Sequence, residues 1–178
     1  MTARAAMTAR ALVAYGSKYG STAGIAKAIA ETLRDRGLET DIQPADEVRT
    51  IEPYGVVVVG GGLYVGRWHG DAVAFVKRFE ADLIDRPTWL FSSGPTGGTA
   101  KAETEMARVL AEQPGPPGNV ARIAKRIGIR GHRTFAGAVT EGMGGFFARW
   151  IPKGDWRDFD AVRAWATEIA SATPVAVS

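Results

Sequence analysis

Short apolar runs alternate with amphipathic stretches along this 178-residue chain. The first apolar run covers residues 11–15, and after it apolar positions recur every four residues, at Ile25, Ile29 and Leu33. This change of period predicts a strand followed by a helix from about Ser21 to Arg36. The same alternation recurs further along the chain, so we expect an α/β fold.

Later apolar runs predict the remaining strands and helices. Val56–Val59 is a continuous β-branched run, which is typical of a central parallel strand that is buried on both faces. The three glycines at 60–62 predict a loop directly after it, and Asn119 is a candidate cap for a later helix. The predicted strands are 11–15, 38–42, 56–59, 88–93 and 134–139, and the predicted helices are 21–36, 70–84, 101–112, 119–127 and one beginning near 159.

Five strands that alternate with helices predict a parallel sheet covered on both faces and joined by right-handed crossovers. In such sheets ligands bind beyond the carboxyl ends of the strands, where the strand order reverses. Three loops that contain glycine leave those ends, at 16–22, 60–70 and 94–99. We therefore expect the three loops to meet at one edge of the sheet.

The first of these loops has the residues of an anion-binding site. A helix N-terminus carries unpaired backbone N–H groups and the positive end of the helix dipole, and glycine lets the backbone close around an oxygen-rich group. Ser17, Ser21 and Thr22 add hydroxyl groups at the same place. The alternative is that Ser21 or Thr22 merely caps the helix.

Composition narrows the range of functions. The chain has no cysteine and two histidines, which excludes disulfides and thiolate sites and makes a histidine-rich metal centre improbable. It contains no apolar run of the ~20 residues that a membrane span needs. A net charge of +3 does not by itself indicate binding to nucleic acid. We expect one domain over residues 10–174, after a disordered segment 1–9. The four residues 1–4 recur as residues 7–10.

Residues 17–22 resemble the phosphate loop of the flavodoxin family. That loop has the form Ser/Thr-x-Thr-Gly-x-Thr directly after the first strand, and Ser17-Lys18-Tyr19-Gly20-Ser21-Thr22 matches it except that Tyr19 replaces the middle hydroxyl residue. The resemblance implies an α/β fold of the flavodoxin-like type, a three-layer sandwich with a five-stranded parallel sheet in the order 2-1-3-4-5. It also implies FMN as the cofactor.

Within that family the chain is most similar to the branch of the menaquinone-dependent protoporphyrinogen dehydrogenases. The similarity lies in residues 57–60, 63–69, 75–77, 91–93, 135–138 and 155–156. It implies an FMN-dependent oxidoreductase that oxidises protoporphyrinogen IX, with a quinone as acceptor. One alternative is a flavodoxin-type electron carrier between redox proteins, although carrier flavodoxins are acidic and this chain is basic. Another is an interaction module that has lost the flavin site.

The resemblance also implies which residues bind the cofactor. No catalytic side chain and no metal is expected, because flavin N5 carries the chemistry. Tyr64 and Trp68 are candidates to stack on the flavin ring, with simple packing as the alternative for each; His69 is a candidate proton donor or a solvent-facing residue. The expected cofactor-binding residues are Ser17, Lys18, Tyr19, Gly20, Ser21, Thr22, Leu63, Tyr64, Val65, Gly66, Trp68, Ser93, Gly94, Pro95, Thr96, Gly97 and Gly98.

Two further segments bear on partners and location. Basic residues at 122, 125, 126, 130 and 133 form either a solvated surface or a docking surface for acidic groups. Residues 144–153 combine aromatic bulk with positive charge, so they either pack on the domain, cover the flavin or touch a membrane surface. The expected partners are a small redox substrate, a quinone or a redox protein, and no nucleic acid. The expected location is the cytoplasm, with peripheral contact to the inner face of the cell membrane as an alternative.

Overall fold

The computed structural model describes residues 10–18, 20–64, 67–94, 115–139, 154–155 and 157–174. Its central sheet contains five parallel strands: β1 (Arg10–Gly16), β2 (Glu39–Pro44), β3 (Val56–Tyr64), β5 (Thr88–Gly94) and β6 (Gly131–Ala136). Their order is β2-β1-β3-β5-β6, which is 2-1-3-4-5 when the parallel strands are counted along the chain. A short strand β4 (Arg67–Trp68) pairs antiparallel with the end of β3. The predicted parallel sheet is therefore confirmed.

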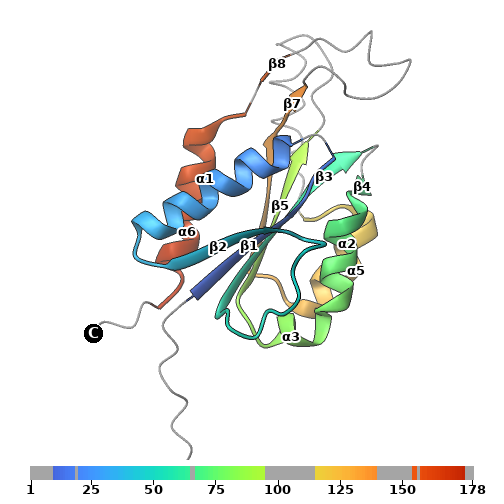
Figure 1. The fold of residues 1–178 in the computed structure, drawn as a ribbon. Helices are drawn as coiled ribbons and strands as arrows, with labels where there is room; N and C mark the ends of the chain where they lie inside the picture. Colours follow the sequence, from blue (N-terminus) through green and yellow to red (C-terminus); the bar gives the residue numbers. More distant parts are fainter. Residues whose placement is uncertain are drawn as a thin grey trace, which may run out of the picture.

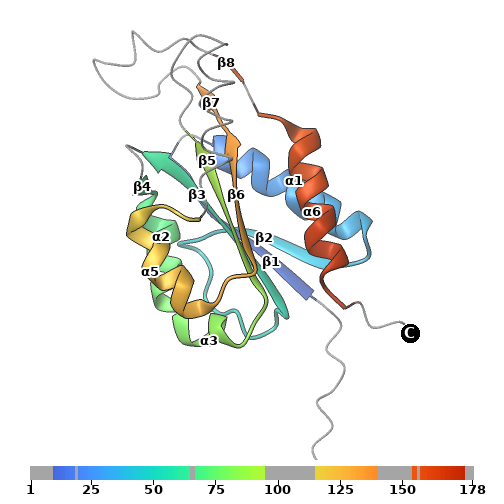
Figure 2. The ribbon, with the colours of Figure 1, turned by 180° about the vertical axis from the view of Figure 1, so that it is seen from behind.

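Helices cover both faces of this sheet. Figures 1 and 2 show α1 (Ser21–Asp35) and α6 (Phe159–Ser171) on one face, and α2 (Gly70–Arg78), α3 (Glu80–Ile84) and α5 (Gly118–Ile127) on the other. Each interface has its own cluster of buried apolar side chains. This arrangement is the three-layer sandwich predicted from the sequence.

Alternation along the strands divides the core between the two faces. In β1, Leu12 and Ala14 belong to the cluster under α2 and α5, whereas Ala11 and Val13 belong to the cluster under α1 and α6. The four valines at 56–59 divide in the same way and are at most 2% exposed. The prediction of a central strand buried on both faces is confirmed.

The three glycines after this run do not form the predicted loop; they continue β3. Gly60, Gly61 and Gly62 pair with Phe91, Ser92 and Ser93 of β5. A Cβ atom on Gly60 would lie 2.0–2.5 Å from the ring of Phe91, and one on Gly61 would lie 2.5–2.8 Å from the ring of Trp68. Glycine is present because neighbouring aromatic rings occupy the space over the strand, not because the chain turns.

Three smaller differences concern element boundaries. The predicted helix 70–84 is divided at Phe79 into α2 and α3. The last parallel strand begins earlier than expected, at Gly131, and ends at Ala136, after which β7 (Ala138–Val139) pairs with β8 (Gly154–Asp155). Asn119 does not cap α5; Pro117 occupies the N-cap position.

Several predictions lie outside the described residues. They are the disordered segment 1–9, the helix 101–112, the roles of the segment 144–153, and the cofactor-binding positions 19, 65, 66 and 95–98. In the described part of the chain, no helix is long and apolar enough to cross a membrane.

Candidate functional site

The carboxyl ends of β1, β3 and β5 meet at one edge of the sheet, as expected for parallel strands. The backbone N–H of Lys18, after β1, donates to the hydroxyl of Tyr64, at the end of β3, over 2.9 Å. The hydroxyl oxygens of Ser21, at the start of α1, and Ser93, in β5, are 3.4 Å apart. The loops that follow these strands therefore begin side by side, and this edge is the candidate site.

The loop after β1 presents the N-terminus of α1 at this edge. Gly20 is the N-cap residue and has φ 84°, a left-handed conformation that glycine adopts without strain. Its N–H donates to the Ser17 hydroxyl over 3.0 Å. The first turn of α1 contains no acidic residue, so no carboxylate neutralises the positive end of the helix dipole.

The interpretation of Ser21 or Thr22 as a mere helix cap is wrong. Neither residue is the N-cap, and the Gly20 cap has no side-chain hydrogen bond. The Ser21 hydroxyl instead accepts the backbone N–H of Ala138 over 2.9 Å, which ties the start of α1 to the segment after β6. Thr22 is 1% exposed, and its hydroxyl forms no hydrogen bond with the described residues. The Thr22 oxygen is not fully enclosed, so its hydroxyl is able to donate to a group placed at the helix N-terminus.

Tyr64 and His69 form a second group at the edge. The Tyr64 and His69 rings meet edge-on, with centroids 5.6 Å apart. His69 is the N-cap of α2: its ring Nδ1 accepts the backbone N–H of Asp71 at 3.3 Å, and the backbone N–H of His69 donates to the carbonyl of Gly62 at 2.8 Å. His69 is therefore half-buried and held in place, and it orients the ring of Tyr64.

Trp68 is buried below this group and anchors β4. It is 3% exposed, and its indole N–H donates to the hydroxyl of Ser92 over 2.8 Å. The Ser92 hydroxyl is also 2.8 Å from Nε2 of His132, and burial lowers the pKa of His132 to about 4. The tautomer of neutral His132 decides which of the two atoms is the donor in this bond. These three side chains form one hydrogen-bonded chain, which we call the Trp68–Ser92–His132 chain; Trp68 and Ser92 are buried and His132 is half-buried.

The backbone of β4 is held from the other side by α5. The amide side chain of Asn119 accepts the N–H of Trp68 at 3.1 Å and donates to the carbonyl of Trp68 at 3.2 Å. Two such bonds imitate the pairing of a neighbouring strand. The side chain of Asn119, which lies in the first turn of α5, therefore binds β4 and does not cap the helix.

The structure thus brings together eight of the predicted site residues: Ser17, Lys18, Gly20, Ser21, Thr22, Tyr64, Ser93 and Gly94. Leu63 packs against the apolar core and Trp68 lies within it. Sequence reasoning missed Ala138, Asn119, Ser92 and His132 as supporting residues. The position of Ala138 could have been predicted, because it follows the last strand and must lie at the same edge. Nothing in the sequence indicates the pairing of Asn119 with Trp68.

The chemistry that this edge offers is anion binding beside an aromatic ring. Hydroxyl groups, backbone N–H groups and a helix N-terminus suit a phosphate. No group of three or more His, Asp or Glu residues that could hold a metal ion occurs in the described residues.

Comparisons with known proteins agree with this geometry. The fold is shared with solved structures, among them the following three. Oxidised flavodoxin 1 from Bacillus cereus has a TM-score of 0.60 at 14% identity over 93% of this chain and all of its own. The flavodoxin of Streptococcus pneumoniae TIGR4 has a TM-score of 0.56 at 18% identity over 93% of this chain and all of its own.

The rubredoxin oxygen:oxidoreductase of Desulfovibrio gigas has a TM-score of 0.58 at 15% identity over 92% of this chain. The match spans only 35% of that longer protein. At these identities the three structures establish the fold alone. The family model described as flavodoxin domain, however, matches residues 12–151. This chain belongs to the flavodoxin domain family.

Proposed function

We propose that this protein binds FMN at the carboxyl edge of its sheet and transfers electrons through it. The observation that carries the proposal is the loop after β1, where the uncompensated N-terminus of α1 meets the Thr22 hydroxyl. Membership of the flavodoxin domain family supports the identity of the ligand.

The residues present fit the phosphate of FMN. Backbone N–H groups in the first turn of α1 and the hydroxyls of Ser17 and Thr22 are donors, and a dianion suits the positive end of the helix. Ser21 already accepts from Ala138 and lies beside Ser93, so it holds the loop in shape. We propose that the backbone N–H groups of the first turn of α1 and the Thr22 hydroxyl bind the phosphate, with Ser17 and Lys18 beside them.

Tyr64 is the proposed contact of the flavin ring. It lies at the end of β3, it is fixed by Lys18 and His69, and it is partly exposed, whereas Trp68 is buried. We assign to Trp68 the support of the segment that carries Tyr64. Bound FMN would supply one- or two-electron transfer at its ring, and the protein would supply position and electrostatic environment.

Two redox roles follow from different features. The resemblance of residues 63–69 to the protoporphyrinogen dehydrogenases favours oxidation of protoporphyrinogen IX with a quinone acceptor. The fold shared with flavodoxins over the whole length of their chains favours an electron carrier. The two one-electron potentials of the bound flavin separate these roles: widely spaced potentials with a very low second value indicate a carrier, and a single two-electron wave indicates an enzyme. Turnover of protoporphyrinogen with a menaquinone analogue tests the substrate directly.

The first experiment is an absorption spectrum of the purified protein after incubation with FMN and removal of free flavin. We expect bound flavin that acid releases as FMN. Thr22→Val removes one hydroxyl at constant shape, and a hydrogen bond to a charged group is worth ~1.5–3 kcal/mol, so FMN affinity should fall about 10- to 100-fold. Thr167→Val on α6 is the matched control and should leave affinity unchanged. A colourless protein that takes up no FMN contradicts the proposal.

A further inference from the structure

The face of α2, β4 and α5 contains a groove next to the candidate site. The groove has a volume of about 540 Å³, and its floor and walls include Trp68, Val73 and Ala74. Arg67 and Lys77 line it as well, and no acidic residue does. Its lining is therefore part apolar and part polar, and both of its charged side chains are positive.

Two contacts hold α5 in place beside the groove. Asn119, which lines the groove, pairs with the backbone of Trp68 in β4. Outside the groove, Arg126 of α5 donates to both carboxylate oxygens of Glu80 in α3, at 2.5 and 3.0 Å. The position of α5 relative to β4 and α3 is therefore set before anything binds.

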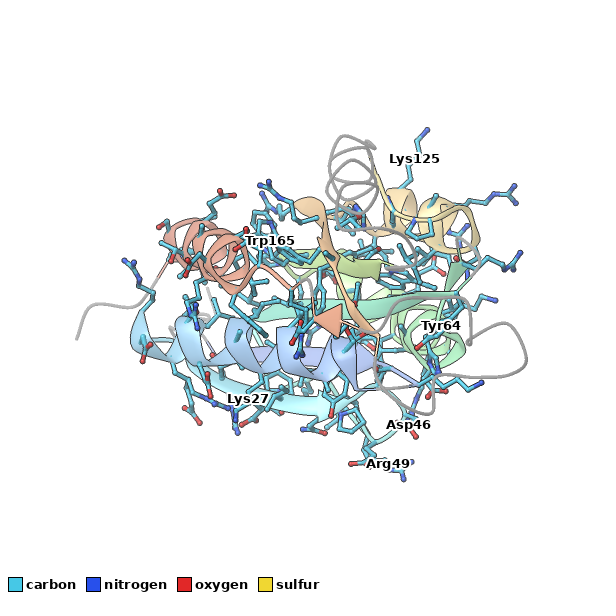
Figure 3. All side chains as sticks on the ribbon, turned by 90° about the horizontal axis from the view of Figure 1, so that it is seen from above. Lys27, Asp46, Arg49, Tyr64, Lys125 and Trp165 are labelled. Carbon is cyan, nitrogen blue, oxygen red and sulfur yellow. The ribbon has the colours of Figure 1, made fainter. Side chains whose placement is uncertain are left out.

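Positive charge continues beyond the groove along α5. This helix contains Arg122, Lys125 and Arg126 and no acidic residue. Of the four exposed cations Arg67, Lys77, Arg122 and Lys125, none forms an ion pair with the described residues. Figure 3 shows Lys125 pointing away from the body of the protein on the α5 side.

The opposite face differs in its charge pattern. There Lys27 pairs with Glu31 at 3.8 Å and Arg163 pairs with Asp160 at 3.2 Å. Figure 3 shows Lys27 on the α1 side, with Trp165 buried between α6 and the sheet. Arg34 and Arg36, both at the C-terminal end of α1, also form no ion pair with the described residues. The four cations of β4, α2 and α5, in contrast, lie beside or along the groove.

We infer that the α2–α5 face is the docking surface for an acidic redox protein. This rests on the proposed function, because electron transfer needs a partner near the flavin. Arg67 and Trp68 lie only a few residues after Tyr64, so a partner seated in the groove lies next to the proposed ring contact. The ten-residue helix α5 is about 15 Å long, so the cations extend over a length that suits a protein surface better than a small molecule. Opposite charges would steer the partner onto this face.

The surface can be mapped without relying on the flavin. Isotope-labelled protein, with and without FMN, is titrated with zinc-substituted rubredoxin, a small acidic diamagnetic redox protein, at low ionic strength. We expect saturable amide shifts confined to residues 67–78 and 118–127 in both samples. A basic c-type cytochrome should produce none. Shifts on α1 and α6, no shifts at all, or stronger binding of the cytochrome would overturn the inference.

Two double charge-reversal variants of equal net charge distinguish an effect of this surface from an effect of the overall charge of the protein. Lys77→Glu with Arg122→Glu should weaken rubredoxin binding tenfold or more at low salt, with the difference lost at high salt. The matched double variant Lys27→Glu with Arg163→Glu has the same net charge on the other face and should weaken binding less than about threefold. Equal effects of the two double variants would overturn the inference. Failure to bind FMN would refute the proposed function, whereas the shift map decides the docking surface independently.

Discussion

Removing the Ser92 hydroxyl tests the Trp68–Ser92–His132 chain. Ser92 is fully buried, and its oxygen accepts the indole N–H of Trp68 and contacts Nε2 of His132, each at 2.8 Å. Ser92→Ala removes this hydrogen bond from the buried indole of Trp68 and from the half-buried ring of His132. An unsatisfied buried polar group costs ~1–3 kcal/mol. We therefore expect the free energy of unfolding to fall by about 2–4 kcal/mol, which corresponds to a melting temperature lower by ~5–15 °C.

Urea unfolding measures this loss, and hydrogen exchange of the Trp68 indole shows whether β4 has loosened. The control is Ser171→Ala at an exposed position in α6, which should change stability by less than about 0.5 kcal/mol. Because Trp68 supports the segment that carries Tyr64, FMN affinity should fall in Ser92→Ala and not in the control. If Ser92→Ala unfolds within about 0.5 kcal/mol of the unchanged protein, the three side chains do not act as one chain.

Three further predictions concern pH and packing. Burial lowers the pKa of His132 in the folded protein to about 4, so as pH falls below about 6.5 the unfolded state takes up the His132 proton first. The free energy of unfolding should therefore decline between pH ~6.5 and 4, by at most ~3 kcal/mol. His132→Asn should remove this contribution to the pH dependence, as measured by unfolding curves at several pH values. The Tyr54 hydroxyl donates to Asp41 at 2.7 Å, and burial raises the pKa of Tyr54 to about 12. The stability that Tyr54 contributes should therefore be present below pH ~10 and lost as pH rises through 12. Tyr54→Phe should be less stable by about 1 kcal/mol at pH 8 and should lack this alkaline decline. Gly60→Ala forces a methyl group against the Phe91 ring and should cost ~2 kcal/mol or more, whereas Gly70→Ala, with nothing near its Cβ position, should be close to neutral in the same melts.

The sequence predicted the parts of the fold that depend on local pattern. The valines at 56–59 indicated a central strand because β-branched residues without polar interruption suit burial on both faces. The convergence of three loops followed from topology alone. The glycines at 60–62 were misinterpreted because what makes them necessary, the rings of Phe91 and Trp68, comes from other parts of the chain.

The candidate site was predictable to the same extent. Ser17, Gly20 and Thr22 lie where the motif indicated, because a helix N-terminus after a strand is a local feature. The roles of Asn119 and Ser92 depend on which side chains from other elements face them, and no short-range pattern contains that information. Cofactor binding by positions 65 and 66, next to Tyr64, and by positions 95–98, after β5, is still a prediction, because these positions lie outside the described residues.

The most direct test of the central claim compares FMN with riboflavin, which lacks only the phosphate. Flavin fluorescence quenching gives both dissociation constants on the same protein. If the N-terminus of α1 and Thr22 hold the phosphate, FMN should bind at least about 100-fold more tightly than riboflavin, and Thr22→Val should narrow that ratio. Equal affinities for the two flavins, or a ratio that Thr22→Val leaves unchanged, would contradict the account.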